Sequence, residues 1–298
     1  KRKRVDEASI TLDELLRRRI ENPVCWIKAD PERFWIRPVQ VTQDEVMWIY
    51  MLRGDTDVLA QLDAVEGLRR LGLQMHVVDP LLSPKALEEV VKNRDYYYQV
   101  RIAAAKALAF YASRARHGKD EAETRMRQDA ESNGEWKAGE EKPPMLAYRA
   151  LNDYLKIHYY DSGNQIWRSN NFSDFADYFL KRGVIRAVAT IQDNESLSPT
   201  KVVDCLVSLL KDNDNGRNAY SDCYYLHDLI LCLGQIRLSK TESPEKIWDQ
   251  ISRYLEYDRV LPSYRNLIST AALRATCELM VADVLPRDKL RFKDFTTY

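Results

Sequence analysis

Residues 60–68 read AQLDAVEGL and residues 100–108 read VRIAAAKAL, so one helix pattern returns after 40 residues. Small side chains at Ala64 and Ala104 let one helix lie close to a neighbour, and the Val and Leu residues around them fill the seam. A period of about 40 residues is typical of HEAT and armadillo arrays, in which each helix pair buries its apolar face only against the next pair. The pattern predicts a mostly α protein, a HEAT/armadillo-like α-superhelix that presents long surfaces to partners.

The composition fits a soluble, ordered and helix-rich protein. Of the 298 residues, 45% are hydrophobic and 30% are charged. The 45 Lys and Arg residues balance the 45 Asp and Glu residues, so no overall field attracts nucleic acid. The longest apolar run, residues 107–112, is far shorter than the ~18 residues that span a bilayer, so we expect no membrane partner. Because the chain opens on Lys1 rather than on methionine, we expect it to be part of a longer protein.

The composition along the chain divides it into three regions. Residues 1–23 form a polar lead-in with one short amphipathic stretch. Residues 24–41 are rich in β-branched and aromatic residues on both sides of the turn sequence at residues 29–32, which predicts a short β-hairpin. Residues 42–298 form the helical repeat domain. Within it, residues 118–144 contain no Ile, Leu, Val, Phe or Tyr, so we expect a disordered insertion there.

Several helix starts can be placed from capping residues. Thr42 and Glu45 have the spacing of a capping box, in which the two side chains satisfy free amides of the first turn. Serine followed by proline is also typical of a helix start. Three further helices are expected to open in this way, at Ser83, Ser198 and Ser243.

No residue pattern predicts catalysis, a cofactor site or a metal site. The sequence has no HExxH helix, no glycine-rich phosphate loop and no GxSxG elbow. The histidines are scattered, at His76, His117, His158 and His227. The cysteines form no CxxC pair, which favours buried free thiols in a reducing compartment; they are Cys25, Cys205, Cys223, Cys232 and Cys277. We therefore predict no catalytic, cofactor-binding or metal-binding residue and no small-molecule substrate, and the partner-binding residues stay unknown.

Aromatic residues gather at the predicted helix ends. They form runs at residues 96–98, 159–160, 172–179 and 224–225. Stacking of single-stranded nucleic acid requires basic residues between the rings, whereas the neighbours here are mostly Asp, Asn and Ser. The runs therefore favour core packing and contacts between repeats, with a minority anchoring a partner protein.

The segment 213–225 predicts a rigid corner between two helices. Its Asn and Asp side chains favour turns because they bond to nearby backbone, and Gly216 supplies a free φ angle. Ser221 or Asp222 can cap the following helix. We expect three aromatic residues to pack this corner, Tyr220, Tyr224 and Tyr225.

Two local basic clusters are the only parts of this neutral chain that we expect to meet DNA phosphates. One is Lys1–Arg4, which also resembles a nuclear import signal. The other comprises Arg287, Lys289, Arg291 and Lys293. We expect DNA binding through them to be weak and to fall steeply with salt, because phosphate contacts release counterions.

Three irregular segments carry a family resemblance. The first is WIKADP at residues 26–31, followed by WIYMLR at residues 48–53 and DVLAQ at residues 57–61. The second is NNFSDFADYFL at residues 170–180, and the third is NDNGRNAYSDCYY at residues 213–225. Helix periodicity does not produce such polar and aromatic strings. Together they resemble subunit 2 of the general transcription factor TFIID, well over residues 24–240 and more weakly beyond.

The resemblance implies an architecture and a role. The family is similar in architecture to zinc aminopeptidases, with a peptidase-like domain that lost its zinc ligands, a small β-sandwich and a long α-helical superhelix. Residues 24–41 would be the last strands of the sandwich, and residues 42–298 the superhelix. The implied role is nuclear, non-enzymatic and architectural. The family helps to position TFIID on core promoter DNA for initiation by RNA polymerase II, and it docks with TFIID subunits 1 and 8.

Two other interpretations stay open. A generic HEAT-repeat adaptor would have the same fold and a continuous acidic or peptide-binding concave face. The C-terminal domain of an active zinc aminopeptidase would instead follow an intact HExxH helix with its distant glutamate.

Overall fold

The computed structural model describes residues 24–34, 39–72, 82–114, 143–193, 195–239 and 242–289. These residues form ten α-helices, two short 3-10 helices and one two-stranded hairpin. The α-helices are α2 (Glu45–Gly54), α3 (Val58–Leu71), α4 (Leu82–Lys92), α5 (Tyr98–Arg114), α7 (Pro143–Tyr159), α8 (Phe175–Ala189), α9 (Thr200–Lys211), α10 (Cys223–Gly234), α11 (Glu245–Val260) and α12 (Leu267–Val281). The shorter elements are β1 (Tyr160–Asp161), β2 (Ile166–Trp167), η1 (Tyr264–Asn266) and η2 (Arg287–Lys289).

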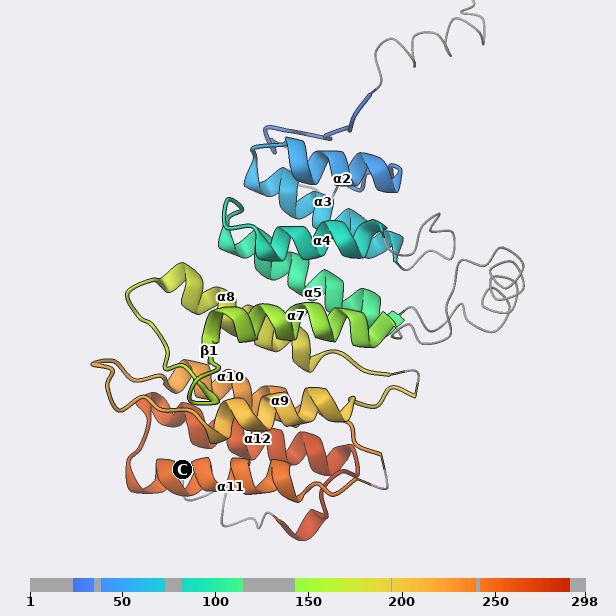
Figure 1. Ribbon diagram of the computed structural model, residues 1–298. Helices are drawn as coiled ribbons and strands as arrows, with labels where there is room; N and C mark the ends of the chain where they lie inside the picture. The colour runs from blue at the N-terminus through green and yellow to red at the C-terminus, as the bar shows by residue number, and fades with distance from the viewer. Residues whose placement is uncertain are drawn as a thin grey trace, which may run out of the picture.

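The helices stack as antiparallel pairs in two layers (Figure 1). The pairs are α2/α3, α4/α5, α7/α8, α9/α10 and α11/α12. The second helices of the pairs pack on one another in succession, α3 on α5, α5 on α8, α8 on α10 and α10 on α12. We call these second helices the inner layer, and the first helices of the pairs the outer layer. The inner layer therefore carries most of the contact that joins one pair to the next.

The repeated helix pattern lies where two neighbouring helices pack, as the sequence predicted, and both helices belong to the inner layer. Residues 60–68 fall on α3 and residues 100–108 on α5, and these two helices pack against each other. Ala64 and Ala104 are fully buried in this seam. Arg101 is buried too. Its guanidinium donates to the Val91 carbonyl at 2.8 and 3.0 Å and to the Tyr154 hydroxyl at 3.0 Å, so its charge lies in a polar niche of the core.

Glycine allows the closest approaches between inner-layer helices. A Cβ atom built on Gly183 of α8 would lie 2.5 Å from the Ile102 side chain of α5. A Cβ atom on Gly234 of α10 would lie 2.7 Å from the Cα atom of Ala275 on α12. Both distances are far below the ~3.5–4.0 Å that carbon atoms prefer. The tight stacking of these helices therefore depends on the missing side chains.

The segment before α2 is not a strand pair in its described part. Residues 24–34 and 39–44 contain no strand, and residues 35–38 lie outside the described residues. The predicted turn is present, because the Arg33 amide donates to the Asp30 carbonyl at 2.9 Å. The Ile27 amide donates to the Gln43 side chain at 3.0 Å instead of to a neighbouring strand. A side chain of the helical domain thus supplies a bond that a β-ladder would otherwise make.

The predicted helix starts are displaced by a few residues. Helix α2 begins at Glu45, whose carboxylate accepts the Ser83 amide at 3.1 Å rather than closing a capping box with Thr42. Helices α9 and α11 begin at Thr200 and Glu245, one residue after the predicted prolines.

The predicted insertion overlaps the start of α7. This helix begins at Pro143 and so includes Pro143-Pro144, which we had assigned to the insertion. Proline is compatible with a first helical turn, whose amides have no intrahelical partner. The rest of the predicted insertion, residues 118–142, lies outside the described residues.

Candidate functional site

The two polar-aromatic segments that are far apart in the sequence meet at one edge of the stack. This edge is where outer-layer helices end and inner-layer helices begin, and the connections before α8 and α10 lie along it (Figure 1). The Asn218 side chain donates to the Asn170 carbonyl at 2.9 Å. The rings of Phe172 and Tyr220 meet edge to face with 6.0 Å between centroids. Residues 170–180 and 213–225 therefore form one continuous surface.

The 213–225 connection is held by its own side chains, as predicted. Asn213 donates to the Asp222 carboxylate at 2.7 Å, and the Asn215 side chain donates to the Tyr220 carbonyl at 2.8 Å. The Gly216 amide donates to the Asp214 carboxylate at 2.8 Å. These bonds close a turn at each end of the loop. The loop therefore presents a formed surface.

Two details of the predicted corner are wrong. Gly216 does not adopt a positive φ angle, so its conformational freedom is not what shapes the turn. Of the three tyrosines, only Tyr225 is buried, with 2% of its surface exposed. Tyr220 is 68% exposed and Tyr224 is 49% exposed, because the loop turns both rings outward.

A buried lysine lies beneath this surface. Lys181 of α8 donates to the Asn170 side chain at 2.9 Å and to the Arg168 carbonyl at 3.3 Å. Its ammonium group also lies over the rings of Tyr225 at 4.8 Å and Tyr159 at 5.3 Å. Burial lowers the pKa of Lys181 to about 8, although the nearby carboxylates oppose this shift. The lysine ties the segment before α8 to the core.

Asp222 completes the polar network between α8 and the corner. Burial raises the pKa of this carboxyl group, and the hydrogen bond from Asn213 opposes the shift. Its attraction to Lys181 also favours the charged form. Lys181 was not singled out from the sequence, and Asp222 was predicted only as a possible helix cap. The one indication for Lys181 was position, since it lies two residues after the aromatic run of residues 172–179.

A second charged cluster joins α8 to α10. Arg182 contacts the Asp228 carboxylate at 2.6 Å, and Arg186 bonds to the other oxygen of the same carboxylate. Asp228 is buried, and the His227 ring lies 3.3 Å from it. The Arg182 guanidinium also lies over three rings, those of Tyr178 at 5.4 Å, Phe179 at 5.8 Å and Tyr224 at 5.9 Å. One carboxylate thus fixes a guanidinium in the middle of an aromatic cluster.

Aromatic rings connect three helix pairs along this edge. From the start of α5 to the start of α10 the rings follow one another at centroid distances of 4.6 to 6.4 Å. We call this set the aromatic edge; it comprises Tyr97, Tyr98, Phe172, Phe175, Tyr178, Phe179, Tyr220 and, through Arg182, Tyr224. Its most exposed members are Tyr220 and Phe175, the latter 60% exposed. Packing within the protein accounts for the buried rings of this set, but it does not account for the exposure of Tyr220 and Phe175.

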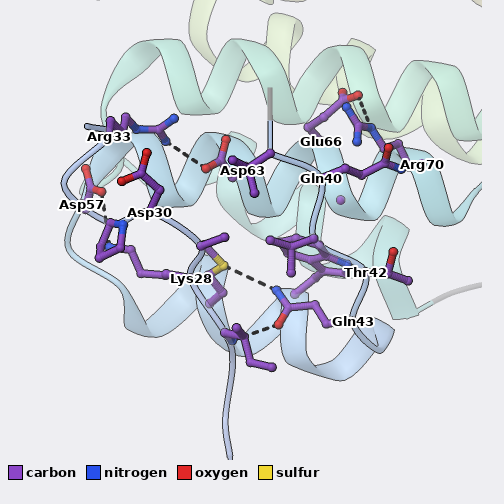
Figure 2. Close-up of a pocket in the computed structure, with 18 of the residues that line it drawn as sticks. Lys28, Asp30, Arg33, Gln40, Thr42, Gln43, Asp57, Asp63, Glu66 and Arg70 are labelled. Atoms are coloured by element: carbon purple, nitrogen blue, oxygen red, sulfur yellow. Dashed lines mark hydrogen bonds and ion pairs between the residues drawn. The ribbon is translucent and has the colours of Figure 1, made fainter. Parts of the chain in front are cut away.

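A polar pocket of about 430 Å³ lies near the start of the chain (Figure 2). Its charged groups pair with one another. Lys28 lies 3.3 Å from Asp57 and 3.1 Å from Asp55 behind the wall, and Arg33 lies 2.8 Å from Asp63. The hydrogen bond to Asp55 raises the pKa of Lys28. Since these charges are satisfied within the pocket wall, we assign no ligand to it.

A more open pocket of about 560 Å³ lies between the outer-layer helices α7 and α9. Its lining includes the basic residues Lys156 and Lys201, the acidic residue Asp204 and the buried thiol of Cys205. Burial raises the pKa of Cys205 to about 12, so the thiol is protonated and unreactive at neutral pH. This thiol is therefore structural.

The remaining predicted residues do not come together. Among the described residues, no group of three or more His, Cys, Asp and Glu side chains could hold a metal ion. None of the described helices combines the length and apolar character needed to cross a membrane.

Of the two predicted basic clusters, most residues lie outside the described part of the chain, namely Lys1–Arg4, Arg291 and Lys293. Lys289 lies 5.5 Å above the Trp248 ring.

Comparison with protein families gives one match along most of the chain. The family described as "TAF2-like, TPR repeats" matches residues 45–298. That description names TPR repeats, where the 40-residue period had suggested HEAT or armadillo repeats. Both classes are arrays of stacked helix pairs, and the two-layer stack has this organisation.

Curated relatives from distant eukaryotes match the same region. The protein named "Transcription initiation factor TFIID subunit 2" from Danio rerio is 30% identical over 291 residues, which cover 93% of this chain and 22% of that protein. The protein of the same name from Schizosaccharomyces pombe is 29% identical over 268 residues, covering 85% of this chain and 20% of that protein. The chain thus spans about a fifth of the length of these relatives. Since the family match runs from residue 45 to residue 298, the chain belongs to the TAF2-like family with TPR repeats.

Proposed function

We propose that this chain is a non-enzymatic, architectural region of a nuclear TFIID subunit 2, on which other TFIID subunits dock. One observation carries the proposal: the relatives named "Transcription initiation factor TFIID subunit 2" match this chain along 85 to 93% of its length. The matched region is a continuous stack of helix pairs, an architecture whose long surfaces suit protein partners. The proposed partners are TFIID subunits 1 and 8, with core promoter DNA as a partner of the assembled complex.

The form of the stack supports docking by a preformed surface. The corner at residues 213–222 is tied by side-chain bonds to its own turns and to the segment before α8. A partner that binds such a surface does not have to order it first, so less conformational entropy is lost on binding. The balanced charge of the chain favours a protein partner over direct, unaided binding of DNA.

Co-purification tests the proposal. The tagged chain would be co-expressed with TFIID subunits 1 and 8 and washed at physiological salt. We expect at least one of the two subunits to be retained. A folded chain that retains neither subunit would contradict the architectural role.

A parallel assay tests the non-enzymatic part of the proposal. The purified chain would be incubated with fluorogenic aminoacyl substrates, with and without a chelator. We expect no turnover above the buffer control. Turnover that the chelator abolishes would show a zinc peptidase and overturn this part of the proposal.

A further inference from the structure

Two of the most exposed rings of the aromatic edge belong to segments that also carry carboxylates. Phe175, 60% exposed, follows Asp174 at the start of α8. Tyr220, 68% exposed, belongs to the loop whose turn is closed by Asp214. The two rings are connected through Phe179, Tyr178 and Phe172, at centroid distances of 5.1 to 6.4 Å. They are therefore parts of one surface rather than isolated exposed side chains.

The connections that carry these rings are acidic although the whole chain is neutral. Residues 160–178 and 211–222 hold five carboxylates besides the buried Asp222, and three basic side chains, for a formal charge of −2. The five carboxylates are Asp161, Asp174, Asp177, Asp212 and Asp214. Among the described residues none of the five makes an ion pair, whereas Asp228 nearby is shared by two arginines. These two stretches thus carry a net negative charge, and the cations that act on Asp177 and Asp161 are Lys181, which is buried, and Arg168, at longer range than an ion pair.

An arginine of the protein itself shows that rings of this set bind a cation. The Arg182 guanidinium lies 5.4 to 5.9 Å from the centroids of three rings of the same set while its other contact is a carboxylate. Cations bind over aromatic faces because the ring quadrupole is negative there, and arginine does so most often. Phe175 and Tyr220 are exposed rings in segments that also carry the carboxylates of Asp174 and Asp214, so this surface offers both kinds of group to a cation. Single-stranded nucleic acid needs cations between the rings that are free to meet phosphates, whereas Arg182 is paired with Asp228 and the two connections have a formal charge of −2.

From this surface we propose that the aromatic edge binds an extended, arginine-containing segment of a partner protein, with its guanidinium groups over Phe175 and Tyr220. The carboxylates of Asp174 and Asp214 supply the opposite charge. This inference rests on the proposed function, because it names the chemistry of the segment that would dock. Tyr220 and Phe175 are connected by a fixed chain of rings, so cations at both ends bind to one rigid platform.

Fluorescence anisotropy with defined peptides tests the inference. The whole chain would be titrated with fluorescein-labelled peptides of alternating Arg and Ser, of alternating Glu and Ser, and of Pro and Ser, and with a single-stranded oligonucleotide. We expect the Arg-Ser peptide to bind most tightly. Equal or tighter binding of the Glu-Ser peptide, the Pro-Ser peptide or the oligonucleotide would overturn the proposed chemistry.

Substitutions locate the binding. Phe175→Ala and Tyr220→Ala should each weaken binding of the Arg-Ser peptide about two- to fivefold, the loss of one exposed ring under a cation. Tyr220→Phe keeps the ring and should bind as the unmodified chain does. The matched control is Tyr50→Ala, because Tyr50 on α2 is 53% exposed and lies away from this edge. An effect of Tyr50→Ala as large as that of Tyr220→Ala would show non-specific binding.

Two variants test how much the negative charge of the carboxylates contributes to peptide binding, without disturbing the fold. Asp174→Asn keeps an oxygen for the Asp177 amide, and Asp214→Asn keeps one for the Gly216 amide. Each should weaken peptide binding about twofold and make it less dependent on salt. Unchanged affinity in both variants would refute the role of the carboxylates.

The outcomes separate this inference from the proposed function. Co-purification with TFIID subunits alongside failure of all basic peptides would refute only the aromatic edge as their site. Binding of the Arg-Ser peptide without co-purification would refute only the TFIID assignment.

Discussion

Gly234→Ala should destabilise the stack although it adds only one methyl group. Gly234 is the last residue of α10, and its Cα faces the middle of α12. The added Cβ would lie 2.7 Å from the Cα and 2.9 Å from the Cβ of Ala275. Because the nearest atom belongs to the backbone, no side-chain rotation can relieve the clash. The two helices would have to separate.

The size of the effect follows from the geometry. Carbon atoms prefer a separation of about 3.5–4.0 Å, so the seam must open by about 1 Å. Overpacking of this kind costs about 1–3 kcal/mol. Alanine recovers at most about 1 kcal/mol through its helix propensity, and less at a helix end. We therefore expect a net loss of about 1–2 kcal/mol, which lowers the melting temperature by about 2–6 °C for a protein of this size.

Differential scanning calorimetry measures this change, with Gly216→Ala as the matched control. A Cβ on Gly216 would meet only the Asp214 carboxylate at 3.2 Å, and Asp214 is exposed. The control should stay within about 0.5 kcal/mol of the unmodified chain. A Gly234→Ala protein that melts at or above the unmodified chain would refute the tight α10/α12 seam.

Four further changes test the packing and electrostatics of the core. Ala105→Leu should cost about 1–3 kcal/mol in a urea titration, because Ala105 is fully buried, and an unchanged midpoint would argue against the repeat seam. Arg101→Leu should cost about 1–3 kcal/mol because it leaves buried acceptors without a donor, and a neutral result would mean that this arginine is exposed in solution. Tyr225→Ala should cost about 3–5 kcal/mol and Tyr224→Ala about 0.5 kcal/mol or less, so equal thermal shifts would contradict their different burial. Relative to Lys181→Met, the unmodified chain should gain stability as the pH rises from about 8 towards 10.5. The reason is that the pKa of Lys181 is lower in the folded chain, so the unfolded chain binds more protons in that window. A difference in melting temperature that does not change with pH would show that Lys181 is not buried.

The helical array was predictable because it depends on local periodicity. Small residues at Ala64 and Ala104 mark the seam, and the structure places them there. At residues 24–34 the β-branched and aromatic residues predicted a strand, but the described residues contain none, and the Gln43 side chain takes the Ile27 amide. Strand propensity alone does not reveal such a competing partner.

The candidate site was predictable only as two separate segments. Their sequences predicted turns and aromatic contacts, and both are present. That residues 170–172 would meet residues 218–220 depends on the order in which helix pairs stack, which no local pattern contains. Lys181 and Arg101 were missed for a related reason. Charged residues are usually exposed, and each of these two is buried here where segments outside its own helix supply oxygen acceptors.

Hydrogen exchange of the chain alone and within TFIID assembled with subunits 1 and 8 tests the central claim most directly. If the chain is a docking region that uses the aromatic edge, the amides of residues 168–179 and 213–224 should exchange more slowly in the complex. Helix α2, at the far end of the stack from α12, provides an internal reference (Figure 1). Unchanged exchange in both segments, in a complex that contains the chain, would contradict the account.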